Sequence, residues 1–107
     1  MAARPVQKIK FPLVDIHRRT VSLGGIPAHL TRTQFDLVAY LAANPGFVRT
    51  RLQILDAISP GATGEYYDRN VDSHVRRSRE AFRAAWGIAE WIETAQGVGY
   101  RWREVGQ

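Results

Sequence analysis

Residues 68–86 read DRNVDSHVRRSREAFRAAW, and the spacing of apolar residues in this stretch decides how the rest of the chain is interpreted. On a helix, which turns about 100° per residue, Val71, Val75 and Phe82 fall on one narrow face with Ser78 in the same seam. This face is expected to point into a core. The opposite face carries most of the five arginines of the stretch and consists of Arg69, Ser73, Arg76, Arg77 and Glu80, with Arg83 at its edge. Such a face suits a DNA phosphate backbone, but taken alone it is equally typical of a solvated helix that only maintains solubility.

The residues after this helix distinguish the two interpretations. Residues 91–103 read WIETAQGVGYRWR, and their aromatic and β-branched residues suit strands around a tight reversal at residues 96–99. A basic amphipathic helix followed by a small hairpin is typical of a winged helix, in which the helix enters the major groove and the hairpin forms the wing. The sequence therefore favours DNA binding over a merely solvated surface.

Four segments of the chain together resemble the C-terminal effector domain of OmpR/PhoB-type response regulators. In order they are LTRTQFDLVAYLAANPG (30–46), TRLQIL (50–55), DRNVDSHVRRSR (68–79) and IETAQGVGYRW (92–102). The resemblance covers roughly residues 13–104, and the last two segments in combination are far more specific than either alone. It implies a winged helix-turn-helix of the α+β class, with an N-terminal antiparallel β-sheet, three helices and a C-terminal β-hairpin wing.

Length and composition agree with a single globular domain. The chain has 107 residues, 45% of them hydrophobic, and its 15 Lys and Arg against 10 Asp and Glu give a net charge of +5. This charge favours a polyanionic partner, either nucleic acid or an anionic membrane surface. No stretch approaches the roughly 18 to 20 apolar residues that span a bilayer, the start MAARPVQKIK lacks the apolar core of a secretory signal, and cysteine is absent. A cytoplasmic protein is expected.

The domain is expected to span residues 11–105, with residues 1–10 as a flexible N-terminal segment or linker remnant. Short β-prone runs at residues 11–14, 20–23 and 26–30 predict an antiparallel sheet, and the resemblance implies a fourth strand among these residues.

Two helices are predicted before the basic one. Thr31 with Gln34, and Thr50 with Gln53, form capping-box patterns that open a helix over about residues 32–43 and a shorter one that includes residues 52–58. The resemblance implies a small β-bridge between residues 47–48 and the wing.

A loop over residues 60–67 is predicted from its composition. Asp68 suits the N-cap of a recognition helix over about residues 69–85, and the wing is expected over about residues 91–103. In the family this loop contacts RNA polymerase, so the resemblance makes Glu65, Tyr66 and Tyr67 candidates for that contact. The alternative is that both tyrosines pack against the helices.

Seven residues of the predicted recognition helix are candidate DNA contacts, namely Arg69, Asn70, Ser73, His74, Arg76, Arg77 and Arg79. The arginines are expected on phosphates, with one of them on a guanine edge, whereas Asn70 and Ser73 are candidates for reading bases. For Arg79, the alternative to a DNA contact is a structural role within the protein. His74 is expected to be packed or close to a phosphate rather than to bind a metal.

Four wing residues are candidate DNA contacts, namely Thr94, Gln96, Gly97 and Tyr100. The resemblance places Thr94 and Tyr100 at positions that meet the DNA backbone. Gly97 and Gly99 are expected to let the turn approach the duplex closely, and Tyr100 has core packing as its alternative. Gln96 stands where many relatives carry arginine, so minor-groove attraction is expected to be weaker.

Two polar residues of the helix are interpreted as structural. Asp72 is expected to pair with Arg76 or with a residue elsewhere in the fold. Ser78 stands where the family usually has leucine; its hydroxyl is expected to bond to the carbonyl of His74, and Ser78→Leu is expected to raise thermal stability.

The leading hypothesis is sequence-specific binding of double-stranded DNA for transcriptional regulation, by the effector half of a two-component response regulator. The resemblance adds a receiver domain, a sensor kinase and head-to-tail dimers on direct repeats of a promoter. The alternative is a winged-helix protein interaction module with weak or no DNA binding, which Ser78, Glu80, Ala81 and Gln96 favour slightly.

Neither an enzyme nor a bound cofactor or metal is expected, because the GxGxxG, P-loop and HExxH patterns are absent. A membrane partner is disfavoured, since the apolar side of the helix is committed to a core.

Overall fold

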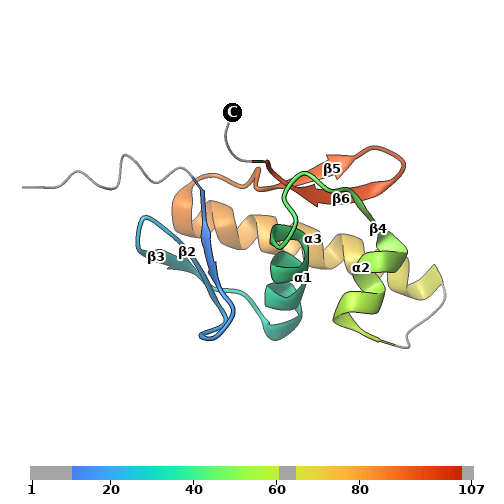
Figure 1. Ribbon diagram of the computed structural model, residues 1–107, viewed down its shortest axis with the longest axis horizontal. Coiled ribbons are helices and arrows are strands. Elements are labelled where there is room, and N and C mark those ends of the chain that lie inside the picture. Colours follow the sequence, from blue (N-terminus) through green and yellow to red (C-terminus); the bar gives the residue numbers. More distant parts are fainter. Residues whose placement is uncertain (1–10, 61–64, 105–107) are drawn as a thin grey trace, which may run out of the picture.

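The computed structural model describes the backbone of residues 11–60 and 65–104, and the side chains of residues 11–60 and 71–104. Within these residues the chain forms three strands, two short helices separated by a short strand, one long helix and a terminal hairpin, whose arrangement is drawn in Figure 1. The bounds are β1 Leu13–Asp15, β2 Thr20–Leu23, β3 Ile26–Ala28, α1 Arg32–Ala42, β4 Arg49–Thr50, α2 Arg51–Ile58, α3 Glu65–Trp86, β5 Ile92–Ala95 and β6 Gly99–Trp102. This is the α+β arrangement predicted from the sequence.

The first three strands form an antiparallel sheet in chain order. Val21 pairs with Val14 on one side and with Ala28 on the other, and Val21 and Ala28 are buried in the core. β1 begins two residues later than predicted, and β3 ends two residues earlier. The expected fourth strand is not found between residues 11 and 31, because the chain after β3 leads almost directly into the N-cap of α1.

Both predicted capping boxes are confirmed. At α1, Thr31 Oγ1 accepts from the Gln34 amide at 3.2 Å, and Gln34 Oε1 accepts from the Thr31 amide at 3.0 Å. The corresponding bonds of Thr50 and Gln53 at α2 are 3.1 and 2.9 Å long. These exchanges satisfy amides that a helix start leaves unpaired, which is why the sequence locates both helix starts well.

The long helix α3 begins earlier than predicted. It has 22 residues and starts at Glu65, so residues 65–67 are helical rather than loop, and Asp68 lies inside the helix rather than at its N-cap. Pro60 already follows the end of α2 at Ile58, and an acidic residue suits the first turn of a helix, so no later break is needed. At the other end, Gly87 has φ 77° and its amide donates to Arg83 O at 2.8 Å, which ends the helix.

The terminal hairpin is the predicted wing, and a third strand joins it. β6 lies between β5 and β4, and β4 comprises Arg49–Thr50 rather than the expected residues 47–48. A Cβ on Gly99 would lie 1.9 Å from the Arg49 carbonyl oxygen, so glycine is needed for β4 and β6 to pair. Gly99 therefore serves close packing within the protein, rather than the expected approach to a duplex.

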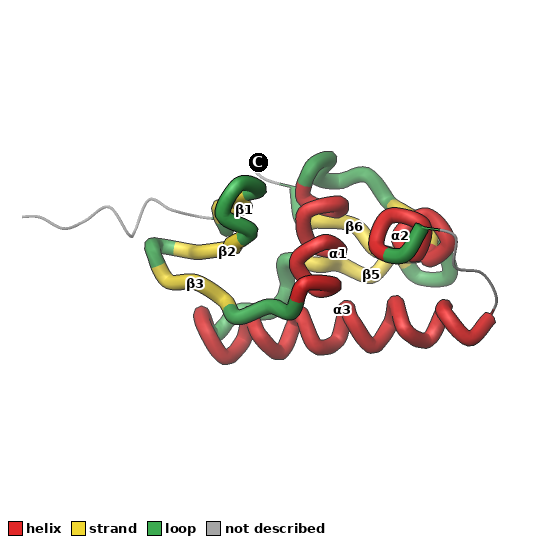
Figure 2. Tube along the Cα trace, turned by 90° about the horizontal axis from the view of Figure 1, so that it is seen from below, coloured by secondary structure: helices red, strands yellow, loops and turns green. Residues whose placement is uncertain are grey.

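α3 forms the base on which the other elements pack. Figure 2 shows α1, α2 and both sheets on the same side of α3, while the described elements leave its other side uncovered. The Phe82 ring stacks on Trp86 with centroids 4.9 Å apart, and the Trp102 ring of the wing meets it edge-on at 6.1 Å. Trp86 Nε1 also donates to Ile26 O at 2.7 Å, which attaches the end of α3 to β3.

Nowhere in the described chain is a helix both long enough and apolar enough for a membrane span.

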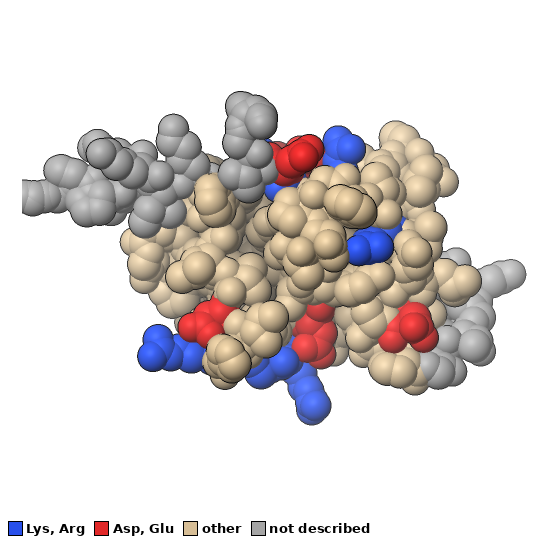
Figure 3. Space-filling view, in the orientation of Figure 1, with Lys and Arg blue, Asp and Glu red and all other residues tan. Residues whose placement is uncertain are grey.

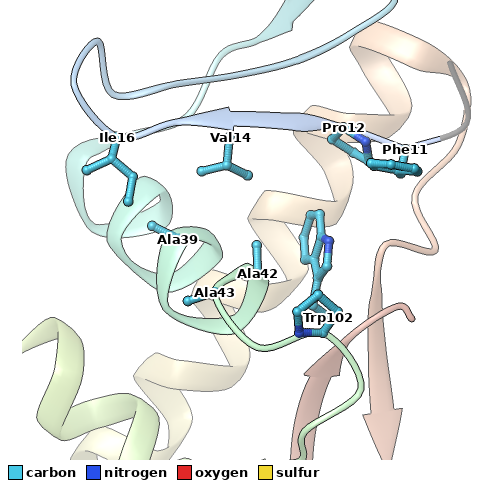
Figure 4. Close-up of a pocket in the computed structure, with 9 residues that line it drawn as sticks. Phe11, Pro12, Val14, Ile16, Ala39, Ala42, Ala43 and Trp102 are labelled. Carbon is cyan, nitrogen blue, oxygen red and sulfur yellow. The ribbon is translucent and has the colours of Figure 1, made fainter. Parts of the chain in front are cut away.

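An apolar hollow of about 290 Å³ lies between β1, α1 and the end of β6 (Figure 4). Val14 and Ile16 face Ala39 and Ala42 across it, and Trp102 lies at one end. The small alanines of α1 leave this space open. None of its lining residues is ionisable, so it offers nothing to a polyanion.

Candidate nucleic-acid interface

The orientation predicted for α3 is confirmed. Val71, Val75, Ser78 and Phe82 are all 0–1% exposed and form the inner face of the helix. On the outer face, Arg76, Arg77 and Arg83 are exposed to solvent. The uncovered side of α3 in Figure 2 is thus the side that carries these arginines.

The opposite side of the molecule has a different charge pattern. In the view of Figures 1 and 3, α1 and α2 lie in front of α3, and basic and acidic side chains form small separate groups amid uncharged surface. The arginine face of α3 is the stronger candidate for contact with a polyanion.

Arg76 has a weak partner on its own helix. Its Nε lies 4.0 Å from Glu80 Oε2, and both side chains are about 60% exposed. An exposed pair at this spacing contributes only about 0.3–0.5 kcal/mol, so a phosphate can replace Glu80 as the partner of Arg76 at little cost.

His74 and Ser73 are half-buried at the side of α3. His74 Nδ1 is buried and has no hydrogen-bond partner among the described residues. Burial, and then the positive charge of Arg77, lower the pKa of His74 below 6.5. His74 is therefore neutral near pH 7.

The described residues contain no group of three side chains suited to holding a metal ion.

Arg79 binds the wing instead of projecting into solvent. Its Nε and Nη2 donate to Ile92 O at 3.1 and 2.7 Å, and Nη2 also donates to Thr94 Oγ1 at 2.9 Å. This arrangement favours the structural alternative for Arg79.

Asp72 connects three elements, as the expectation of a partner elsewhere in the fold anticipated. Its Oδ1 accepts from Arg51 Nε of α2 at 2.8 Å and from the Tyr100 hydroxyl of β6 at 2.6 Å. The bond to Asp72 raises the pKa of Arg51, while burial and then Asp72 raise the pKa of Tyr100.

The four wing candidates divide into two groups. Thr94, Gln96 and Gly97 are exposed, the last two at the tip, where Gly97 has φ 75°. Tyr100 is 6% exposed and has its hydroxyl on Asp72, which favours core packing over a DNA contact.

Ser78 is fully buried, and its Oγ has no hydrogen-bond partner within the described part of the chain. The expected bond to the His74 carbonyl is therefore wrong. The predicted inward position of Ser78 is confirmed.

Six candidates fall where the structure describes only the helical backbone, and their side chains lie outside the described residues. They are Glu65, Tyr66, Tyr67, Asp68, Arg69 and Asn70.

Comparison with known proteins decides the family. A family profile described as "Transcriptional regulatory protein, C terminal" matches residues 25–102. The chain belongs to this family. Its resemblance to the OmpR/PhoB-type effector domain is thereby confirmed, and the family is one of transcription regulators rather than of enzymes.

Individual relatives of this regulatory domain come from several bacteria. The transcriptional regulatory protein VxrB of Vibrio cholerae is 40% identical over 88 residues, which are 82% of this chain and 34% of VxrB. The sensory transduction protein RegX3 of Mycolicibacterium smegmatis is 34% identical over 88 residues, which are 82% of this chain and 38% of RegX3. The chain thus spans about a third of the length of these relatives.

A solved winged-helix structure matches almost the whole regulatory domain. The RstA DNA-binding domain of Klebsiella pneumoniae, in complex with an RstA box, superimposes with a TM-score of 0.74 at 27% identity. The match covers 89% of this chain and 93% of that one.

Arg51 is the residue of this regulatory domain that sequence reasoning missed. It lies 21 positions before Asp72, and no local pattern links the two. Tyr100 did carry a signal, because it alternates with Trp102 and therefore shares the inner face of its strand.

Proposed function

We propose that this chain binds double-stranded DNA sequence-specifically and regulates transcription, with α3 in the major groove and the wing at the minor groove. The observation that carries the proposal is the exposed arginine face of α3, which the other described elements leave uncovered along the helix. The DNA complex of the related RstA domain supports it.

The proposed roles of the residues follow from their chemistry. Arg76 and Arg77 bind phosphates or a guanine edge, because a guanidinium donates in pairs to either. Ser73 contacts bases or the nearby backbone, and neutral His74 can donate one hydrogen bond to a phosphate. Arg69 and Asn70 remain proposed contacts near the start of the same helix.

Further partners belong to the same proposal. The chain acts in the cytoplasm as the effector half of a two-component response regulator, with a receiver domain and a sensor kinase acting on it. It binds direct repeats as a head-to-tail dimer, and residues 65–67 contact RNA polymerase. The family membership supports this set.

The test is binding to a fluorescent mixed-sequence duplex, followed by anisotropy across a salt series. With about four to six phosphate contacts, log K falls with log salt at a slope near −4 to −5, and Arg76→Ala with Arg77→Ala flattens the slope by about two units. The matched control is Arg18→Ala with Arg103→Ala, which removes two exposed arginines outside α3 and is expected to leave the slope nearly unchanged.

Two results would contradict the proposal. One is no measurable binding down to about 50 mM salt, in which case the protein interaction module becomes the better account. The other is an equal loss in both double variants, which would indicate attraction by net charge alone. If the expected slopes are found, selection from random duplexes then identifies the specific sequence.

A further inference from the structure

The wing is attached to α3 through both of its strands. On β6, the Tyr100 hydroxyl donates to Asp72 Oδ1 at 2.6 Å. On β5, Thr94 Oγ1 and Ile92 O accept from Arg79, which lies two helical turns after Asp72. α3 therefore holds each strand of the hairpin by a separate side chain.

The two attachments meet at one cross-strand pair. Thr94 is paired with Tyr100 in the β5–β6 ladder, and only the pair Ala95–Gly99 lies between them and the turn. The base of the hairpin is held by the burial of Ile92 and Trp102 in the core and by the Arg79 bonds to Ile92 O. The bonds at Thr94 and Tyr100 act on the outer half of the wing, close to its exposed tip at Gln96 and Gly97.

Arg51 and Arg79 also both contact the Tyr100 ring. Their guanidinium carbons lie 5.4 and 5.7 Å from its centroid, a distance at which a cation is attracted to an aromatic face. The carboxylate of Asp72 offsets the charge of Arg51 at 2.8 Å. Hydrogen bonds join Arg51, Asp72 and Tyr100, and Arg79 contacts the Tyr100 ring while its own hydrogen bonds go to β5. Such a network restricts its members to a single arrangement.

We propose that Arg51, Asp72, Arg79 and Tyr100, the helix–wing network, fix the orientation of the wing relative to α3 and so position its tip at the minor groove. This inference rests on the proposed DNA binding. The four are positioning residues, and the contacts themselves belong to the outer face of α3 and to the tip.

The first test needs no DNA. Tyr100→Phe keeps the ring and removes only the hydroxyl, and Tyr40→Phe is the matched control. Amide order parameters from NMR relaxation at residues 95–98 are expected to fall from about 0.85 toward 0.6 in Tyr100→Phe and to stay unchanged in Tyr40→Phe. Unchanged order at the tip in a folded Tyr100→Phe protein would overturn the inference, whatever the protein binds.

The second test asks whether the network positions the tip on DNA. Gln96→Arg adds one cation at the tip, and a cation that reaches the duplex steepens the salt slope by about 0.9. We expect this increment in the otherwise unaltered protein and less than half of it in the Tyr100→Phe background. Arg76→Ala should change the slope equally in both backgrounds, because α3 itself is not displaced.

The outcomes separate the two proposals. Equal increments from Gln96→Arg in both backgrounds would overturn the positioning role while leaving DNA binding intact. If the tip loses order in Tyr100→Phe but the unaltered protein binds no duplex, the proposed function fails and the minor-groove role fails with it, while the effect of the network on the wing stands.

Discussion

The Tyr100 hydroxyl donates a 2.6 Å hydrogen bond to Asp72 Oδ1, and this bond joins the wing to α3 across 28 residues of sequence. The same oxygen accepts from Arg51 of α2. One carboxylate therefore connects both halves of the helix-turn-helix to the wing, which gives Asp72 a role in stability as well as in orientation.

This connection makes folding stability sensitive to acid. Burial raises the pKa of Asp72, but the hydrogen bonds from Tyr100 and Arg51 outweigh it and hold the pKa below its ordinary value of 3.8. Because the folded state then binds fewer protons than the unfolded state, the contribution is complete above pH 3.8 and is lost as the pH falls through the lowered pKa. Asp72→Asn should flatten the fall in stability between about pH 5 and pH 3, as measured by urea unfolding. Asp56→Asn alters an exposed carboxylate of α2, and in this variant the unfolding free energy should fall with decreasing pH as it does in the unaltered protein.

The parts of the fold predicted well from the sequence are those determined by neighbouring residues. Each capping box exchanges hydrogen bonds between residues three apart, so Thr31 and Thr50 locate the starts of α1 and α2. The inner face of α3 follows from helical periodicity, and the hairpin follows from its reversal at Gly97.

The parts predicted poorly depend on residues far apart in the chain. The partners of Asp72 lie 21 and 28 positions away, and Arg79 finds Ile92 only once the wing has folded back. An arginine on a helix has the same local signal whether it meets a phosphate or a carbonyl. The roles of Arg79 and Tyr100 therefore required the tertiary structure.

His74 makes stability sensitive to a milder change of pH. Burial, followed by the charge of Arg77, holds the pKa of His74 below 6.5, so the unfolded state takes up this proton first as the pH falls. Stability from this source is complete above pH 6.5 and decreases below it. His74→Gln should reduce the loss of unfolding free energy between about pH 7.5 and pH 5.5. His29→Gln, an exposed histidine change, serves as the control, and an equal reduction in both variants would contradict the assignment to His74.

Ser78 is a position at which a smaller, apolar side chain should improve the protein. Its hydroxyl is fully buried without a hydrogen-bond partner among the described residues, and such a group costs about 1–3 kcal/mol. Ser78→Ala removes the hydroxyl, adds no volume and favours the helix, so thermal and urea unfolding should show a gain of about 1 kcal/mol. Ser73→Ala on the outer side of the same helix should gain less than about 0.5 kcal/mol, which is the share that helix propensity supplies. Equal gains in the two variants would mean that burial of the Ser78 hydroxyl carries no cost.

Substitution of Gly99 tests whether pairing with β4 is needed to hold the wing. Alanine at this position would bring Cβ to 1.9 Å from the Arg49 carbonyl oxygen. The nearest atoms are all backbone atoms of β4, so no flexible side chain can move aside. The two strands must separate, so Gly99→Ala should lower the unfolding free energy by about 3 kcal/mol, in the upper range for overpacking. Gly97→Ala is the matched control, because Gly97 has φ 75° but no atom within 4 Å of an added Cβ, and its cost should be about 1 kcal/mol of backbone strain. Urea unfolding of both variants measures the difference, and a Gly99→Ala cost no larger than that of Gly97→Ala would show that β4 can leave the sheet without consequence for the wing.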